Sequence, residues 1–543
     1  MSAAPLLAAL LLGSAPDMAP AAPVNVLWIT CEDLSPRLGS YGDALARTPH
    51  LDRLAAEGTR YTHAFGVYGV CAPNRFALVT GTYPTGAGAG PMRVTKRTAA
   101  LADATDPVLR AIPTWEATPP APVTCFPELL RAAGYYCTNN VKQDYQFTPP
   151  VTVWDESSKT AHWRNRPGHG TAGAVPFFSV FNFTSTHESK LHKRTSPAVT
   201  DRAAVEVPPF LPDTPAMRED LARQYDNLAE LDKQVGALLA ELDADGLREN
   251  TVVMFFSDHG DGLPRHKRWV YDSGLQVPLI VRFPQGHPDR GEPGTTTDRL
   301  VSFVDFAPTV LSLAGIEPPA WMPGPAFLGE HAGEPREYVF AARDRMDPAP
   351  ETIRAARGPR FKYVRNLRPD LPYWGFVPYR DRAAGAAKIT ELIEENALGP
   401  DQWQLSGTSK PAEELYDTQA DPHEIRNLAA DPAYADVLTD LRTATERWME
   451  RTNDSGTLDG AELIATLWPN GEQPTTATPV IAAADGLITI RCETLGASIG
   501  YKLPGDAAWR VYTEPFPAAA GATVRAVAHR IGWKPSQRAT LTP

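Results

Sequence analysis

The sequence predicts an α/β protein with a mostly parallel sheet sandwiched by helices. Two observations predict this fold class. Continuous apolar runs of strand length occur at 25–30, 175–183, 251–257 and 277–284, as is typical of strands buried on both faces. Helical patterns lie between these runs, and strands that alternate with helices favour a parallel sheet.

Two of the intervening helices have clear signals. "TPHLDRLAAEG" at 48–58 begins with Thr48, a suitable N-cap, and Pro49, which suits a first turn. Gly58 suits the end of this helix. A long amphipathic helix is expected over 218–245, because apolar residues recur there at helical spacing: Leu221, Tyr225, Leu228, Leu231, Val235, Leu238 and Leu242.

The N-terminus predicts export to the periplasm or the cell exterior. Residues 1–23 contain the apolar run "LLAALLLG" followed by small residues, which fits a secretory signal peptide and is too short to span a bilayer. The positive n-region is missing, because no Lys or Arg precedes Arg37. We expect no integral membrane association.

Four regions are expected after this signal, since 543 residues exceed a single typical domain. An α/β core over 24–329 is followed by a smaller α+β part over 330–451, which contains the strand "RFKYVRNL" and a closing helix. Residues 452–473 are polar and rich in turn formers, which predicts a linker. Short β-rich stretches over 474–543 predict an immunoglobulin-like β-sandwich.

Composition excludes some functions. A net charge of −12 argues against nucleic-acid binding, so an anionic ligand would need local basic pockets. The five cysteines show no metal-type CxxC spacing. Cys125 and Cys137 would pair in an oxidising compartment if the fold brought them together, and otherwise they stay free.

Polar side chains follow three of the predicted strands. Glu32 and Asp33 come after the first run, His187 after the second, and Asp258 and His259 after the third. Ligands of open α/β sheets bind beyond the carboxyl ends of the strands. The sequence therefore predicts a site at this edge of the sheet.

"YGVCAPNRFALVTG" at 68–81 places Cys71 at an expected helix start. Its "CAPNRFALVTG" fits C-x-P-x-R-x-x-L-x-T-G and resembles the signature of the type I sulfatases, which have an alkaline-phosphatase-like fold. The resemblance covers about residues 24–450. It implies that a formylglycine-generating or equivalent maturation enzyme oxidises Cys71 to formylglycine. The alternative is a buried structural cysteine.

The resemblance also implies a reaction. The hydrated aldehyde attacks sulfur and then expels sulfate, which divides one difficult step into two. The helix N-terminus near Pro73 would face the anion, and Arg75 would stabilise the charge around it.

One divalent cation, calcium, is implied at Glu32, Asp33, Asp258 and His259. The family commonly has Asp where this chain has Glu32, and Asn or Gln where it has His259. Calcium prefers oxygen ligands, so His259 contacts either the metal or the sulfate. Asp258 also resembles the family's base. The alternative is that these carboxylates are solvated loop residues.

Sulfate binding is implied for Lys142, Lys267 and His187, and His187 would also protonate the leaving group. Asp144 stands where the family commonly has a histidine, so it would accept a proton or bind a substrate amine or hydroxyl. His266 is a secondary substrate-binding candidate, unless it belongs to a solvated basic face.

Arg343 and Arg345 would bind a second sulfate or a uronate, because guanidinium suits bidentate anion binding. Ordinary surface ion pairs are the alternative. Together with "THES", this stretch resembles sulfatases of the N-sulfoglucosamine sulfohydrolase-like branch, which implies a sulfated glycan substrate. The tail resembles the chitobiase-type C-terminal module of some glycan-active enzymes.

The leading hypothesis is a sulfatase that hydrolyses an O-sulfate ester or an N-sulfate of a carbohydrate. A phosphodiesterase or phosphonate hydrolase of the same superfamily is an alternative, since fold does not fix substrate. A glycan-binding protein on a catalytically decayed scaffold is the other alternative.

Overall fold

The computed structural model describes residues 23–95, 107–517, 519 and 521–543. The signal peptide expected over 1–23 therefore lies, except for residue 23, outside the described residues. Within the described ranges, no helix has both the length and the apolar character that a bilayer crossing requires.

The central sheet confirms the predicted fold class. Its strands run in the order β4-β3-β5-β1-β6-β7-β2-β8, and β9 pairs with β2. All neighbours are parallel except β7, which is antiparallel to both β6 and β2. The strands are β1 (Asn25–Cys31), β2 (Thr59–Phe65), β3 (Tyr136–Asn140), β4 (Glu156–Ser157), β5 (Phe177–Phe183), β6 (Thr251–Ser257), β7 (Gln276–Arg282), β8 (Thr295–Thr297) and β9 (Val301–Ser302).

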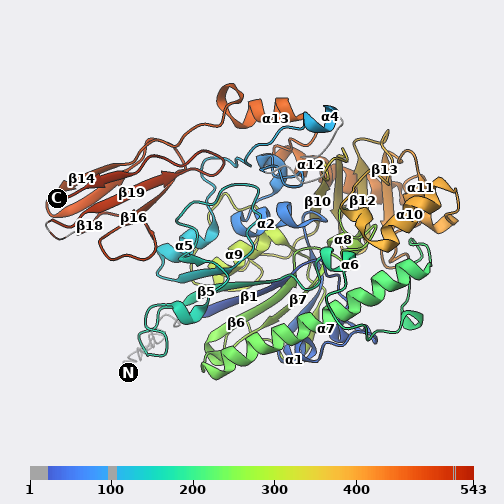
Figure 1. The fold of residues 1–543 in the computed structure, drawn as a ribbon, viewed down its shortest axis with the longest axis horizontal. Coiled ribbons are helices and arrows are strands. Elements are labelled where there is room, and N and C mark those ends of the chain that lie inside the picture. The colour runs from blue at the N-terminus through green and yellow to red at the C-terminus, as the bar shows by residue number, and fades with distance from the viewer. Residues whose placement is uncertain (1–22, 96–106, 518, 520) are drawn as a thin grey trace, which may run out of the picture.

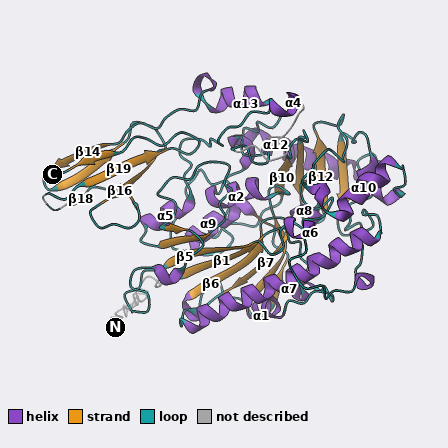
Figure 2. Cartoon of the chain, viewed as in Figure 1, coloured by secondary structure: helices purple, strands orange, loops and turns teal. Residues whose placement is uncertain are grey.

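Helices cover both faces of this sheet (Figures 1 and 2). Side chains alternate along a strand, so Leu27 and Ile29 of β1 pack toward one set of helices and Trp28 toward the other. The first set is α1 (Pro49–Glu57) and α7 (Pro215–Ala244), and the second is α2 (Cys71–Thr80), α5 (Phe126–Ala132) and α9 (Phe306–Leu313). Both faces of the central strands are thereby buried, as the continuous apolar runs predict.

A smaller antiparallel sheet, β10-β11-β12-β13, adjoins the core. The expected strand "RFKYVRNL" is β12, and the expected closing helix is α12, which begins at Ala435. The elements of this part are β10 (Val339–Arg343), β11 (Ile353–Arg357), β12 (Phe361–Asn366), α10 (Ala384–Glu394), β13 (Glu413–Asp417) and α12 (Ala435–Arg451).

The segment 452–473 is more ordered than the linker that its composition predicts. It contains α13 (Gly460–Leu467), which Asp459 caps by accepting hydrogen bonds from two backbone N–H groups. Leu463 and Trp468 pack against Val94 and Trp115 of the core. A few apolar residues are enough to pack this helix against the core. The composition of the segment as a whole is polar, so it does not predict the helix.

The described residues of the segment 474–543 form two small antiparallel sheets that share an apolar interior of Ile488, Ile490, Val524 and Ala526. Their strands are β14 (Val480–Ala484), β15 (Leu487–Arg491), β16 (Ser498–Lys502), β17 (Arg510–Val511), β18 (Phe516–Pro517), β19 (Val524–His529) and β20 (Ala539–Leu541). The immunoglobulin-like and chitobiase-type assignment stays a prediction. All five cysteines are free, so Cys125 and Cys137 form no disulfide.

Candidate active site

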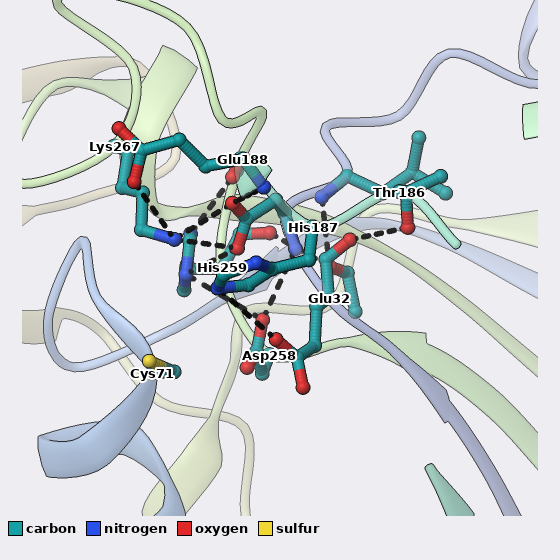
Figure 3. Close-up of polar contacts among 12 residues, drawn as sticks. Glu32, Cys71, Thr186, His187, Glu188, Asp258, His259 and Lys267 are labelled. Carbon is teal, nitrogen blue, oxygen red and sulfur yellow. Dashed lines mark hydrogen bonds and ion pairs between the residues drawn. The ribbon is translucent and has the colours of Figure 1, made fainter. Parts of the chain in front are cut away.

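Three adjacent parallel strands, β5, β1 and β6, end at the same level. Cys31, the last residue of β1, is in register with both Phe183 of β5 and Ser257 of β6. Side chains in the following turns therefore meet beyond this edge of the sheet. The residues that meet there are Glu32, Asp33, His187, Asp258 and His259 (Figure 3).

Cys71 is the first residue of α2, two residues earlier than the expected helix start near Pro73. Its side chain is fully buried, and it lies beside the carboxylates in Figure 3. The Cys71 Sγ, one oxygen of Asp258 and one ring nitrogen of His259 all lie within 4.8 Å of one another. The predicted nucleophile and the predicted acidic cluster thus belong to one site.

Asn74 fixes the turn that presents Cys71. Its Oδ1 accepts hydrogen bonds from the backbone N–H groups of Val67 and Tyr68, both at 2.9 Å. Its Nδ2 donates to the backbone oxygen of Asp258 at 2.7 Å. One buried amide therefore links the start of α2 to the end of β6.

Arg75 lies against the acidic cluster and is held by a chain of amides. Its Nη2 is 3.3 Å from Asp258 Oδ2 and 3.6 Å from Glu32 Oε1. Its Nη1 donates to Asn182 Oδ1 at 2.6 Å, and Asn182 donates in turn to Asn139 Oδ1 at 2.9 Å. These contacts from β5 and β3 fix the guanidinium in one orientation.

Two lysines neutralise two of the acids. Lys142 Nζ is 2.8 Å from Glu32 Oε1, and Lys267 Nζ is 2.9 and 2.7 Å from the two oxygens of Asp33. Burial raises the pKa of Glu32, but the charges of Lys142 and Arg75 outweigh it and hold that pKa at about 2. Glu32 and its partner Lys142 are therefore both charged in the folded protein.

A second buried ion pair lies behind Lys267. Arg268 donates through Nη1 and Nη2 to the two oxygens of Glu188, at 2.8 and 2.9 Å. Glu188 also donates its backbone N–H to Asp33 Oδ2 at 2.7 Å. The pair fixes the carboxylate of Asp33 and the position of Lys267.

His187 presents an N–H toward the cluster. Its Nδ1 accepts a hydrogen bond from the backbone N–H of Ser189 at 3.2 Å, so the proton of the neutral ring is on Nε2. Nε2 lies 3.5 Å from Glu32 Oε2. Burial, with the nearby charge of Lys267, lowers the pKa of His187 to about 4, so the ring is a neutral donor at neutral pH.

The donor set fits a divalent cation. Three buried carboxylates converge from Glu32, Asp33 and Asp258, and Nε2 of His259 has no hydrogen-bond partner among the described residues although it is fully buried. Two groups of side chains here are close enough to hold a metal ion: Cys71, Asp258 and His259 form one, and Glu32, Asp33 and His187 form the other.

The site opens to solvent on the side of Lys142 and Asp144. Asp144 Oδ2 is 3.7 Å from Cys71 Sγ and 3.8 Å from Nη2 of Arg93. The side chains of Lys142, Asp144 and Arg93 are 20%, 23% and 33% exposed. A substrate would approach Cys71 from this side.

Three predicted substrate-binding residues lie apart from this cluster. His266 is buried against Phe210, and its Nε2 is 4.0 Å from Asp261. Arg343 is buried with its guanidinium 3.8 Å from the ring centre of Trp269. Arg345 donates to the backbone oxygen of Asp347 at 2.6 Å and lines a separate cavity that includes Ser455. The alternative of a solvated basic face for His266 is wrong, because the ring is buried, and substrate binding by the three residues stays a prediction.

Sequence reasoning missed the residues that hold the cluster in place. Glu188 and Arg268 directly follow His187 and Lys267 in the chain, so a charged residue next to each predicted site residue was an available signal. Asn74 occupies a variable position of the cysteine motif, and nothing in the sequence distinguishes Asn182 or Arg93.

Comparison with known proteins identifies the family. The model of the sulfatase family matches residues 24–316. An ulvan-active sulfatase of Formosa agariphila is 42% identical over 94% of this chain and 90% of its own length. Human N-sulphoglucosamine sulphohydrolase is 27% identical over 80% of this chain and 91% of its own length.

The fold agrees with this relationship. A solved 2-O GAG sulfatase superposes with a TM-score of 0.57 at 20% identity, over 80% of this chain and 93% of that structure. The family match spans more than half of the chain and includes β1, α2, β5 and β6, which carry the clustered residues. The protein belongs to the sulfatase family.

Proposed function

We propose that this enzyme hydrolyses sulfate from a sulfated glycan, with Cys71 converted to formylglycine. The observation that carries the proposal is the position of Cys71, at the first residue of α2 and within 4.8 Å of ligand atoms of Asp258 and His259. Ulvan is the first substrate class to test, because it is named for the relative that is 42% identical. The more distant human relative supports testing N-sulfates as well.

The cationic side chains would bind the sulfate group. Arg75, Lys142 and Lys267 surround the carboxylates next to Cys71, and charge-assisted hydrogen bonds of this kind are the strong ones. The aldehyde of formylglycine, when hydrated, supplies the nucleophilic hydroxyl. His187 would donate its Nε2 proton to the leaving oxygen or nitrogen of the sugar.

Glu32, Asp33, Asp258 and His259 would hold a divalent cation, which supplies charge stabilisation for the sulfate. The sequence expectation is calcium. Asp258 would also take the proton of the attacking hydroxyl, because its carboxylate lies beside both Cys71 and Arg75.

The open side would contact the sugar. Asp144 and Arg93 lie beside Cys71 and are partly exposed, so they suit hydroxyl, amine or anionic groups of the glycan. Substrate binding by Arg343, Arg345 and His266, and export of the chain, stay predictions.

Maturation would have to precede complete folding, since Cys71 is fully buried. The protein should therefore be produced together with a formylglycine-generating enzyme. Sulfate release is then measured on ulvan fragments and on N- and O-sulfated glycosaminoglycan fragments, with Cys71→Ala as the inactive control.

A matched series of aryl sulfate, aryl phosphate and aryl phosphonate monoesters tests the reaction class. We expect sulfate release to be fastest. Faster phosphate or phosphonate turnover would contradict the proposal in favour of the related phosphoryl hydrolases. Glycan binding without turnover by matured protein would favour the decayed binding protein.

A further inference from the structure

The described residues of 474–543, the C-terminal module, pack directly against the catalytic core at one end of the molecule (Figure 1). Trp468, which follows α13, donates its indole N–H to the backbone oxygen of Gly532 in the module at 3.1 Å and to Thr118 Oγ1 in the core at 3.2 Å. Gly532 has a φ of 83°, and a Cβ there would collide with Thr118. The junction therefore requires glycine at this point, and its two walls are fixed relative to each other.

A cavity of about 710 Å³ lies at this junction, and we call it the junction cavity. Its walls include Thr118 of the core, Thr466 and Leu467 of α13, and Arg530 of the module. Thr466 is exposed, so the cavity opens to solvent. Its volume falls within the range of about 300 to 1,000 Å³ that is typical of ligand sites, which is enough for a ligand of the size of a disaccharide.

Arg530 brings an unpaired positive charge to the junction cavity. Its guanidinium forms no ion pair with any described residue, and its Nε is buried without a hydrogen-bond partner among them. Burial lowers the pKa of this guanidinium, and no nearby carboxylate offsets the effect. The group lies 4.7 Å from the ring centre of Trp533, which orients it. A partly buried guanidinium with free N–H donors favours an anionic ligand.

The acids of the junction cavity do not neutralise this guanidinium. Asp454 is paired with Arg354, whose Nη2 is 2.7 Å from Asp454 Oδ1. Glu450 is exposed and forms no ion pair with a described residue. Its carboxylate can accept hydrogen bonds from sugar hydroxyls, and the exposed side chains of Asn453 and Thr466 offer further polar contacts. The lining therefore suits a ligand with one anionic group and several hydroxyls.

The junction cavity continues toward the active site. It shares Ser455 and Leu458 with the cavity that Arg345 lines. That second cavity reaches Pro91, which is two residues from Arg93 on the open side of the active site. One polymeric ligand can therefore follow a continuous path from the open side to the module.

We propose that the junction cavity is a second glycan-binding site, in which Arg530 binds the carboxylate or sulfate of a sugar distant from the sulfate that is hydrolysed. The inference rests on the proposed function for the glycan nature of the ligand. A chain held at both sites binds more tightly than a fragment held at one, because the second contact becomes intramolecular. The module then contributes affinity for long chains and no chemistry.

Calorimetry on the full chain with unmodified Cys71 tests the proposal without turnover. The probes are disaccharides and long fragments of ulvan. Arg530→Gln should weaken binding of long fragments about tenfold, through one lost charge-assisted hydrogen bond, and leave disaccharide binding unchanged. Arg525→Gln is the matched control, because Arg525 is an exposed arginine of the same module that does not line the cavity. It removes the same charge and should have no effect.

Chemical desulfation of the long fragments identifies the bound anion. An effect of Arg530→Gln that persists after desulfation assigns the contact to a carboxylate, and an effect that disappears with the sulfate assigns it to sulfate. Thr466→Trp fills the cavity from an exposed position of α13 and should weaken binding of long fragments without a change of charge. Amide hydrogen exchange should show protection of residues 449–467 and 530–533 by long fragments only.

Equal affinities of Arg530→Gln and Arg525→Gln for long fragments would overturn the proposal, as would affinity that does not depend on fragment length. If Arg530→Gln fails to fold, Thr466→Trp and hydrogen exchange decide. Binding at the junction cavity by matured protein that releases no sulfate would contradict only the proposed function. Sulfate release with unchanged affinity in both cavity variants would overturn only this second site.

Discussion

The side of the active site next to the sheet and the side that faces solvent hold their charges in different ways. Next to the sheet, Asp33 and His259 are 0% exposed and Lys267 is 2% exposed. On the open side, Lys142 is 20% and Arg93 is 33% exposed. Both sides pair acids with bases, but only the side next to the sheet does so shielded from solvent.

The difference in burial indicates which part of the enzyme's function each side serves. A buried charge that loses its partner is strongly destabilising, whereas an exposed ion pair contributes between zero and about 1 kcal/mol. The buried side is therefore fixed by the fold and suits the shared chemistry of sulfate. The open side tolerates change and suits the recognition of a particular sugar.

His187 lies between the two sides, and its replacement should have the largest effect. His187→Gln should lower kcat/KM for a glycan sulfate about 10²- to 10⁴-fold, because the leaving alcohol loses its proton donor. An aryl sulfate should lose much less, since a phenolate leaves without protonation. Paired kinetics on the two substrates check this, and equal losses would mean that His187 only positions other groups.

Substitution of the two lysines tests the difference between the buried side and the open side directly. Lys267→Ala should lower the free energy of unfolding by about 3 to 5 kcal/mol, because it leaves Asp33 buried without its cation. Lys142→Ala should cost less than this, because Glu32, although buried, keeps the charge of Arg75 at 3.6 Å and the vacated side is open to solvent. Urea unfolding of the two variants checks this. Equal losses would show that the open side is as rigid as the buried one.

Glu188 should make the free energy of unfolding depend on pH. Burial raises its pKa, but Arg268 and Lys267 outweigh burial and lower it from 4.5 to about 2. A pKa that is lower in the folded protein stabilises the fold above pH 4.5, and this stabilisation is lost as the pH falls toward 2.

Glu188→Gln should therefore be less stable than the unaltered chain by about 2 to 3 kcal/mol at neutral pH, the size of a hydrogen bond to a charged group. The difference should shrink as the pH falls from 4.5 to 2. Unfolding measured across this range checks it, and a difference that does not depend on pH would contradict the assignment.

Arg93 should show the smallest effect. Arg93→Ala should raise KM for a glycan sulfate about tenfold through one lost charge-assisted contact, with kcat unchanged. An aryl sulfate should show no change, because it does not reach the open rim. A fall in kcat on both substrates would place Arg93 on the chemical side of the site instead.

The sequence predicts the strands that position the site residues, and the reason is physical. Continuous apolar runs identify the buried parallel strands, and the ends of such strands meet at one edge. Glu32, Asp258 and His187 each directly follow or closely follow such a run, so their meeting could be expected. Cys71 needed the family motif, because a lone buried cysteine has no periodic signal.

Partners and side-chain directions could not be predicted in the same way. Lys267 reaches Asp33 while its neighbour His266 faces Asp261, in a turn where Arg265 and Arg268 have φ of 57° and 75°. A turn with left-handed residues has neither the helical nor the strand period, so spacing along the chain does not tell which side chain faces the site. Asn182 was missed because its role depends on the neighbouring strand β3.

The mass of the peptide that contains Cys71 tests the central claim most directly. The protein should be made with a formylglycine-generating enzyme, digested, and compared with protein made without that enzyme. The account predicts a loss of about 18 Da at Cys71, as a thiol is replaced by the carbonyl of the nucleophile precursor, together with sulfate release. An intact thiol in protein that still releases sulfate would contradict it.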